Sequence, residues 1–148
     1  MKIFIASDHA GPNEKKEIVK YLQGIEGLEV FDLGPSNDDR VNYPDYAKKV
    51  VQSVQQYPDA RGILICGSGI GMSMVANRFK GIRAALCREI EEAKLSREHN
   101  NSNVLCMGAR IISFERMKEL VAVWLKTEFA QGRHAERIQL FDDLGEEV

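Results

Sequence analysis

The most informative part of the chain reads RGILICGSGIG (61–71). Its first half is a short apolar run rich in β-branched residues, which is typical of a strand buried on both faces of a parallel sheet. A glycine-rich turn, GSGIG (67–71), follows at once, and MSMVANRF (72–79) then has the composition of a helix. A strand, a tight turn and a helix in this order predict one βα unit of an α/β fold.

The rest of the chain repeats this alternation on either side. Short apolar segments at 2–7, 28–34, 82–87 and 103–108 predict strands, and amphipathic segments at 13–24, 43–58, 88–100 and 114–130 predict helices. Right-handed crossovers would place helices on both faces of one sheet. We therefore predict an α/β fold with a five-stranded, parallel, doubly wound (Rossmann-like) sheet, in a single domain over residues 1–148.

Composition and charge argue against several classes of protein. The formal net charge is −2, from 20 Lys and Arg against 22 Asp and Glu, so we expect no nucleic-acid partner. No apolar run reaches the roughly 18 residues that span a bilayer, and the first residues do not form a signal peptide, so we expect no membrane partner. Three cysteines without an export signal predict free thiols and a cytoplasmic location. The histidines lack the spacing of metal ligands, so we expect no metal.

Chemically capable side chains lie next to the predicted strands. These are Asp8 and His9 after the first strand, Cys66 at the end of the third, and His99, Asn100 and Arg110 around the last. Ligands of open parallel sheets bind at the carboxyl ends of the strands, so we expect His9 and His99 on one active edge. The alternatives are a surface or capping role for each histidine, and a helix cap for Asp8.

The glycine-rich turn has two interpretations. Its N–H groups and the helix start could form a nest for a phosphate or a developing oxyanion. It could equally be an ordinary tight turn, since it is neither a Walker A loop nor a well-spaced dinucleotide fingerprint. Cys66 could act there as a nucleophile or general base, although a buried structural cysteine is the commoner role. We expect Cys87 and Cys106 in the core.

The segment 131–148 has a short helical pattern of its own. Arg133 and Arg137 lie one turn apart, on one face of a short helix. They could clamp a phosphate between two guanidinium groups. They could also form a solvated basic face beside Glu136.

Six segments of the chain occur in the order and spacing of a known family. They are IASDHAG (5–11), NYPDYA (42–47), CGSGIGMSMVANR (66–78), GIRAA (81–85), REHNNSNVLCMGAR (97–110) and GRHAERI (132–138). With them the chain resembles the type B ribose-5-phosphate isomerases, which are grouped with the subunits of galactose-6-phosphate isomerase. The resemblance implies a three-layer α/β/α sandwich and the interconversion of ribose 5-phosphate and ribulose 5-phosphate without metal or cofactor. It also implies a homodimer or homotetramer with sites shared between subunits, and with the tail 131–148 against the partner.

The resemblance further implies roles for single residues. Cys66 would be the base that moves a proton between C1 and C2, beside the hydroxyl of Ser68. The N–H groups of Gly69, Ile70 and Gly71 would hold the enediolate oxygen. His99 would open the sugar ring, with Asp8 assisting. The other positions would bind substrate: His9, Arg133 and Arg137 the phosphate, Tyr43 the sugar, and Gly67, Asn100 and Arg110 lining the site.

One departure and several alternatives stay open. A branch of the family uses a glutamate as base at a position where this chain has Met72, and methionine cannot accept a proton, so the base is assigned to Cys66. Allose 6-phosphate and galactose 6-phosphate are alternative substrates. The galactose enzyme has two different subunits, whereas this chain alone carries Cys66, His99 and both tail arginines, which favours a homo-oligomer. A non-catalytic phosphosugar-binding or nucleotide-binding module is a distant alternative, and a flavodoxin-like carrier a weaker one.

Overall fold

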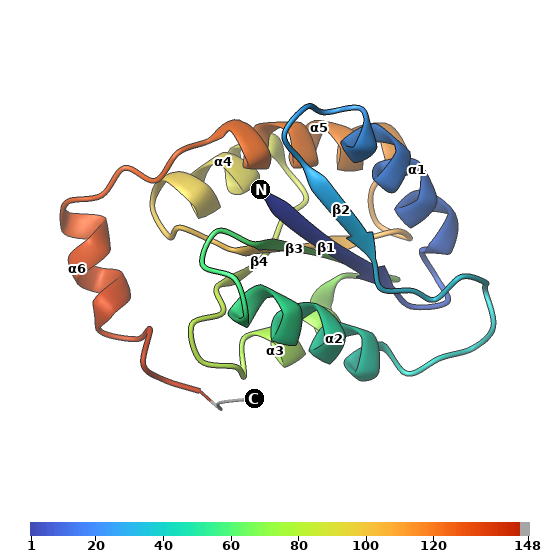
Figure 1. Ribbon diagram of the computed structural model, residues 1–148, viewed down its shortest axis with the longest axis horizontal. Helices are drawn as coiled ribbons and strands as arrows, with labels where there is room; N and C mark the ends of the chain where they lie inside the picture. Colours follow the sequence, from blue (N-terminus) through green and yellow to red (C-terminus); the bar gives the residue numbers. More distant parts are fainter. Residues whose placement is uncertain (146–148) are drawn as a thin grey trace.

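The computed structural model describes residues 1–145, in which strands and helices alternate as predicted (Figure 1). The elements are β1 (Lys2–Ser7), α1 (Pro12–Gln23), β2 (Glu29–Asp32), α2 (Tyr43–Gln55), β3 (Arg61–Cys66), α3 (Ile70–Ala76), β4 (Ala84–Leu86), α4 (Ile90–Glu98), β5 (Val104–Gly108), α5 (Phe114–Lys126) and α6 (Arg133–Gln139). Over the described residues, every helix is too short or too polar to cross a membrane.

The five strands form one sheet in the order β2-β1-β3-β5-β4, and every neighbouring pair is parallel. The register aligns Ile5 with Ile63, and Ile63 with Leu105. Because the chain starts near the middle of the sheet and adds strands on both sides, the topology is doubly wound. The predicted parallel, five-stranded α/β sheet is therefore confirmed.

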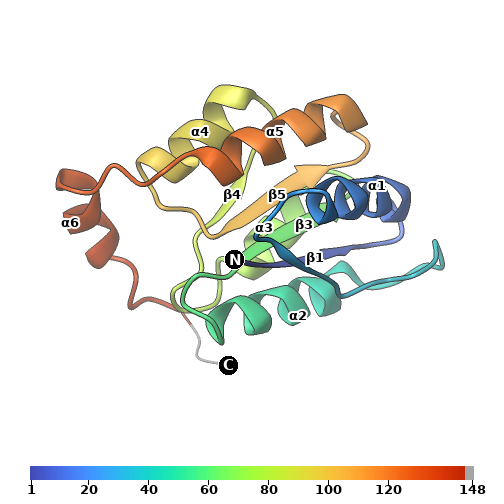
Figure 2. The ribbon, with the colours of Figure 1, turned by 45° about the horizontal axis from the view of Figure 1, so that its top comes forward.

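Helices cover both faces of the sheet, which gives three layers (Figure 2). Side chains alternate along a strand, so β3 sends Ile63 and Ile65 toward α1, α4 and α5, and Leu64 and Cys66 toward α2 and α3. Trp124 of α5 is fully buried in the first layer, and truncating such a side chain to alanine costs about 3–5 kcal/mol. The alternation thus turns Cys66 toward the α2 and α3 layer.

The helix after the glycine-rich turn differs from its predicted limits of 72–79. It begins at Ile70, because Gly69 adopts a left-handed conformation with a φ of 77° and turns the chain straight into the helix. It ends at Ala76, because the side chain of Asn77 exchanges two hydrogen bonds with the backbone of Ala84. A contact with the next strand therefore fixes the end of α3, which local sequence does not reveal.

The two ends of the sheet carry different sets of side chains. Residues that follow β1, β3 and β5 lie at the carboxyl edge, whereas His99 ends α4 and precedes β5, at the amino edge beside α6 (Figure 1). The five residues of β5 span about 16 Å at roughly 3.3 Å per residue. The expectation that His9 and His99 share one active edge is therefore wrong, because a residue before a parallel strand lies at the opposite end from a residue after one.

Candidate active site

A pocket of about 370 Å³ opens at the carboxyl edge of β1, β3 and β5. Eight of the predicted site residues line it: Asp8, His9, Tyr43, Cys66, Gly67, Ser68, Gly71 and Arg110. They come from segments far apart in the chain, and the parallel sheet is what gathers them. The carboxyl-edge half of the predicted site is therefore assembled within a single chain.

Cys66 ends β3 at the floor of this pocket. Only 5% of the residue is exposed, and its Sγ accepts a hydrogen bond of 3.1 Å from the N–H of Gly69. An N–H donor near the start of a helix places positive partial charge beside the sulfur. Cys87 and Cys106 lie in the core as expected, and burial raises the pKa of both thiols, that of Cys87 to about 12.

The shape of the turn depends on glycine at two points. Gly69 has a positive φ, and a Cβ there would lie 2.6 Å from Cδ1 of Leu86 and 2.9 Å from the carbonyl carbon of Met107. A Cβ on Gly71 would lie 2.7 Å from Cζ of Tyr43, so the tyrosine ring packs directly over this glycine. Glycine at these positions therefore brings Tyr43 over the turn and holds the turn close to β5.

The backbone N–H groups of the turn differ in whether they already have a hydrogen-bond partner. The N–H of Gly69 points to Cys66, and the N–H of Ile70 donates to Oγ of Ser68 at 3.2 Å. Within the described chain, the N–H of Gly71 has no hydrogen-bond partner. Of the three N–H groups expected to hold the enediolate oxygen, only that of Gly71 is therefore without a partner among the described residues.

Asp8 and His9 form the wall after β1. Oδ1 of Asp8 accepts the N–H of Ala10 at 2.8 Å, and the N-cap of α1 is Gly11, so the alternative that Asp8 caps this helix is wrong. The Nδ1 atom of His9 is buried and has no hydrogen-bond partner among the described residues. Because buried polar atoms are nearly always hydrogen-bonded, this nitrogen is suited to meet a ligand.

Arg110 supplies the positive charge of the pocket. Its N–H donates to the carbonyl of Gly67 at 2.9 Å, and its side chain lies 3.5 Å from the position of a Cβ on Gly67. Its guanidinium has no carboxylate partner within the part of the chain that the structure describes. An anionic group in the pocket would therefore meet an arginine that is free to pair with it.

Gly69 and Ile70 belong to the glycine-rich turn beside this pocket, and the four remaining predicted site residues lie at the amino edge. His99, Asn100, Arg133 and Arg137 do not line the pocket that contains Cys66. The ring of His99 stacks instead on the ring of His134, with centroids 4.3 Å apart and planes 9° apart. The structure therefore divides the predicted site into a carboxyl-edge half and an amino-edge half.

His134 is a member of the amino-edge cluster that sequence reasoning missed. It lies on α6 between Arg133 and Arg137, inside the quoted segment GRHAERI (132–138), but only the arginines received a role. Partial desolvation and then the positive charges of His99, Arg133 and Arg137 lower its pKa. The signal that could have found it is the third histidine of the chain beside two arginines of the same short helix.

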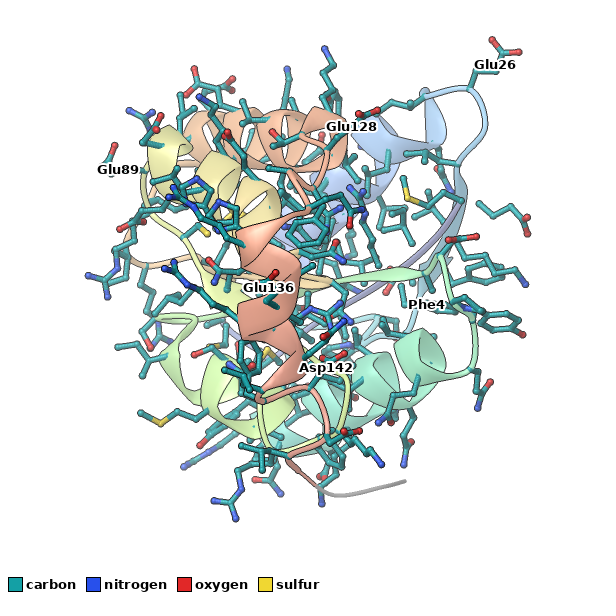
Figure 3. The ribbon with its side chains drawn as sticks, turned by 90° about the vertical axis from the view of Figure 1, so that its left-hand side faces the viewer. Phe4, Glu26, Glu89, Glu128, Glu136 and Asp142 are labelled. Carbon is teal, nitrogen blue, oxygen red and sulfur yellow. The ribbon has the colours of Figure 1, made fainter. Side chains whose placement is uncertain are left out.

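The helix α6 stands away from the sheet at the amino edge (Figures 1 and 2). Figure 3 views the molecule from this side, with Glu136 on the helix and Asp142 beyond its end. Only Ile138 of this helix is buried in the chain. Contacts on either side of the helix include one from the N–H of Ala130 to the carbonyl of Glu98 at 3.0 Å, and those of Asp142 with the N–H of Gly81 and the side chain of Arg83. Most of the α6 surface is therefore open to contact with another molecule.

The site thus consists of a thiol in a glycine-rich turn at the carboxyl edge of a doubly wound α/β sheet, with histidine, aspartate and arginine around it. The family described as Ribose/Galactose Isomerase matches residues 3–141, and the chain belongs to this family. The family resemblance stated from the six sequence segments is therefore confirmed.

Individual relatives agree over almost their whole length. The chain is 44% identical to ribose-5-phosphate isomerase B of Escherichia coli, over 93% of this chain and 92% of the relative. A crystal structure of a ribose 5-phosphate isomerase from Thermotoga maritima is 48% identical, with a TM-score of 0.91, over 97% of this chain and 98% of that chain. The structure of ribose-5-phosphate isomerase B from Mycoplasma genitalium with bound ribulose-5-phosphate is 42% identical, with a TM-score of 0.91, over 95% and 93% of the two chains.

Proposed function

We propose that the protein interconverts ribose 5-phosphate and ribulose 5-phosphate without a metal or organic cofactor. The observation that carries this proposal is the 3.1 Å contact between Sγ of Cys66 and the N–H of Gly69, in a pocket that also holds Asp8, His9 and Arg110. Proton transfer next to a carbonyl needs a positioned base and donors for the charge that develops. The names of the relatives from Escherichia coli and Mycoplasma genitalium support the choice of substrate.

In the proton-transfer step, the thiolate of Cys66 takes the proton from C2 of the open-chain aldose. The electron pair of that C–H bond forms the double bond of an enediolate, whose charge gathers on O1 near the free N–H of Gly71. The hydroxyl of Ser68 passes the O2 proton to O1, and the thiol returns its proton to C1, which leaves a carbonyl at C2. One such donor lowers the barrier by about 3–4 kcal/mol.

Ring opening precedes this step. His99 donates a proton to the ring oxygen while Asp8 accepts the proton of the anomeric hydroxyl, so the ring C–O bond breaks and the aldehyde forms. The phosphate takes no part in the chemistry. It would be bound by His9, Arg133 and Arg137, and its binding energy would hold C1 and C2 against the base.

The site needs a second copy of the chain. Cys66 lies at the carboxyl edge and His99 at the amino edge of a sheet whose strand β5 is about 16 Å long, so one chain does not bring them together. We infer a homo-oligomer in which the amino-edge cluster of one subunit completes the pocket of the next. Contact with a second copy would also cover exposed apolar side chains on α3 and after α6, including Met74, Leu140 and Leu144.

A hexose 6-phosphate is the second candidate substrate, because the family description names galactose beside ribose. Its phosphate is one carbon farther from C1 than that of a pentose 5-phosphate. The span between the Cys66 pocket and the partner's arginines would therefore select between the two sugars. Tyr43, packed over Gly71, and Arg110, packed over Gly67, would line the sugar, together with Asn100 of the second copy.

The test is turnover of ribose 5-phosphate in the presence of a chelator, with allose 6-phosphate and galactose 6-phosphate assayed in parallel. We expect conversion of the pentose, and loss of both turnover and C2-proton exchange with solvent in Cys66→Ala. The control is Cys87→Ala, which removes a thiol from the core and leaves the pocket unchanged. Preference for a hexose would change the substrate, and binding without turnover by the folded protein would identify a binding module instead.

A further inference from the structure

A second polar cavity lies at the amino edge of the sheet, away from the Cys66 pocket. Its volume is about 270 Å³, and the polar residues that line it include Arg61, Arg83, Arg97, Asn101, Asn103 and Asp59. None of these residues has a role in the proposed isomerase reaction. Three arginines around one small cavity are typical of a site for an anion.

The sheet register explains why the arginines meet. Val104 pairs with Gly62 on one side and with Ala84 on the other, so the residues just before them, Arg61, Asn103 and Arg83, fall in one row. Neighbouring strands are about 4.8 Å apart, so the backbones of Arg61 and Arg83 flank that of Asn103 and lie about 10 Å from each other. Arg97 joins them from the end of α4.

Arg83 pairs with Asp142, whereas the other two arginines of this cavity have no such partner among the described residues. Arg97 is only 6% exposed, and within the described residues neither it nor Arg61 pairs with a carboxylate. Burial, and then the charges of Arg61 and Arg83, lower the pKa of Arg97 to about 10, which leaves it charged at neutral pH. A buried charge without a counter-ion is costly, so an anion in the cavity would be favoured.

The hydrogen bonds of the three guanidinium groups also leave donors free. Arg61 uses Nη1 for the carbonyls of Trp124 and Leu125 near the end of α5. Arg97 and Arg83 use Nε and Nη1, and Asn101 accepts from both of them. In the described chain, each arginine keeps its Nη2 amino group without a hydrogen-bond partner. The protein therefore fixes the position of each group and leaves donors for a ligand.

We propose that this arginine cavity binds a small tetrahedral oxyanion, either inorganic phosphate or the phosphoryl group of a phosphate ester. Three guanidinium groups from different elements match an anion with several oxygens better than a single carboxylate does. A bound anion would also brace Asn101, which lies two residues after His99 and has a positive φ of 46°. The cavity is thus a second phosphate site, separate from the pocket that contains Cys66.

The test measures phosphate binding by calorimetry at constant ionic strength, in an Arg133→Ala/Arg137→Ala background that removes the proposed substrate clamp. We expect this protein to bind one phosphate per chain, with chemical-shift changes at the side-chain amides of Asn101 and Asn103. Arg61→Met should weaken binding at least tenfold, whereas Arg116→Met, which removes a surface arginine paired with Glu119 on α5, should leave it unchanged.

A second variant is expected to bind phosphate more tightly, which a loss of folding could not cause. Asp59 is exposed, lines the cavity and opposes an anion there, so Asp59→Asn should tighten phosphate binding about threefold, as expected for removing one like charge several ångströms away. Glycerol 3-phosphate in place of inorganic phosphate shows whether an ester fits. No binding in the clamp-free background, or binding that ignores both Arg61→Met and Asp59→Asn, would overturn the proposal.

Discussion

The rings of His99 and His134 lie almost parallel, with their centroids 4.3 Å apart. His99 belongs to the end of α4 and His134 to α6, so this stack joins the tail helix to the body of the chain. It also places a proposed ring-opening histidine next to two arginines that are proposed to bind phosphate. The amino-edge half of the site is therefore set by the docking of α6, and it should respond when that docking is disturbed.

Acidification should loosen α6. Desolvation and the positive charges of His99, Arg133 and Arg137 lower the pKa of His134 below its ordinary value of 6.5. The docked helix disfavours the protonated ring of His134. The docking of α6 is therefore most stable above pH 6.5, and its stability falls as pH drops through 6.5 toward the lowered pKa. Hydrogen exchange of the α6 amides should accelerate over that range. His134→Phe keeps a stacking ring without a titrating group, and it should remove the acceleration; the same profile in this variant would contradict the assignment.

Gly69→Ala should harm both stability and activity. The substitution places a Cβ 2.6 Å from Leu86 and 2.9 Å from the backbone of Met107, at a φ of 77°. We expect a loss of about 3 kcal/mol in the free energy of unfolding, from left-handed strain plus repacking. The N–H of Gly69 contacts Cys66, so the substitution should displace the Cys66 thiol. A displacement of a catalytic group by about 1 Å can lower the rate about a hundredfold, and we expect a fall in kcat of this size.

The matched control for this variant is Gly81→Ala. Gly81 has a similar φ of 72°, but a Cβ there meets no atom within 4 Å. It should cost only about 1 kcal/mol and leave kcat unchanged. Urea unfolding and steady-state kinetics on both variants therefore separate backbone strain from the clash at the turn. Equal losses of kcat in the two would show that the turn geometry is not what activity depends on.

Only one thiol should react with iodoacetamide in the folded protein. Burial raises the pKa of Cys87 to about 12 and raises that of Cys106 as well, so both stay protonated near pH 8. Cys66 lines the pocket, and its Sγ accepts a hydrogen bond from the N–H of Gly69. We expect one equivalent of label on Cys66, parallel loss of activity, and protection by substrate. Peptide mapping by mass spectrometry checks this, and full activity after labelling of Cys66 would remove it from the role of base.

Much of the fold and half of the site follow from local sequence. The β-branched run at 61–66 and the glycines after it predict the strand, the turn and the place of Cys66, because these depend on periodicity and on backbone freedom. The edge on which His99 lies follows from strand direction rather than residue type. Its stack on His134 follows from the path of the tail after residue 126. Local patterns therefore locate the carboxyl-edge half, and only the tertiary structure locates the amino-edge half.

Two inactive variants should restore each other if the site is shared. Cys66→Ala lacks the base and His99→Ala lacks the ring-opening group, and these residues lie at opposite edges of the sheet. In a mixed dimer, one of the two sites combines an intact pocket with an intact amino-edge cluster. Random reassociation makes half of the dimers mixed, so about a quarter of wild-type activity should return, by the symmetry of a two-fold assembly.

The measurement is isomerase activity after the two variants are co-refolded, with mass spectrometry used to confirm that mixed dimers have formed. Mixing without refolding, under conditions in which subunits do not exchange, is the negative control. A Cys66→Ala/His99→Ala double variant mixed with wild type checks the statistics. A dimer of one wild-type and one double-variant subunit has no complete site, because each of its two sites combines one wild-type half with one altered half. If mixed dimers form from the two single variants and stay inactive, His99 and Cys66 do not act in one shared site.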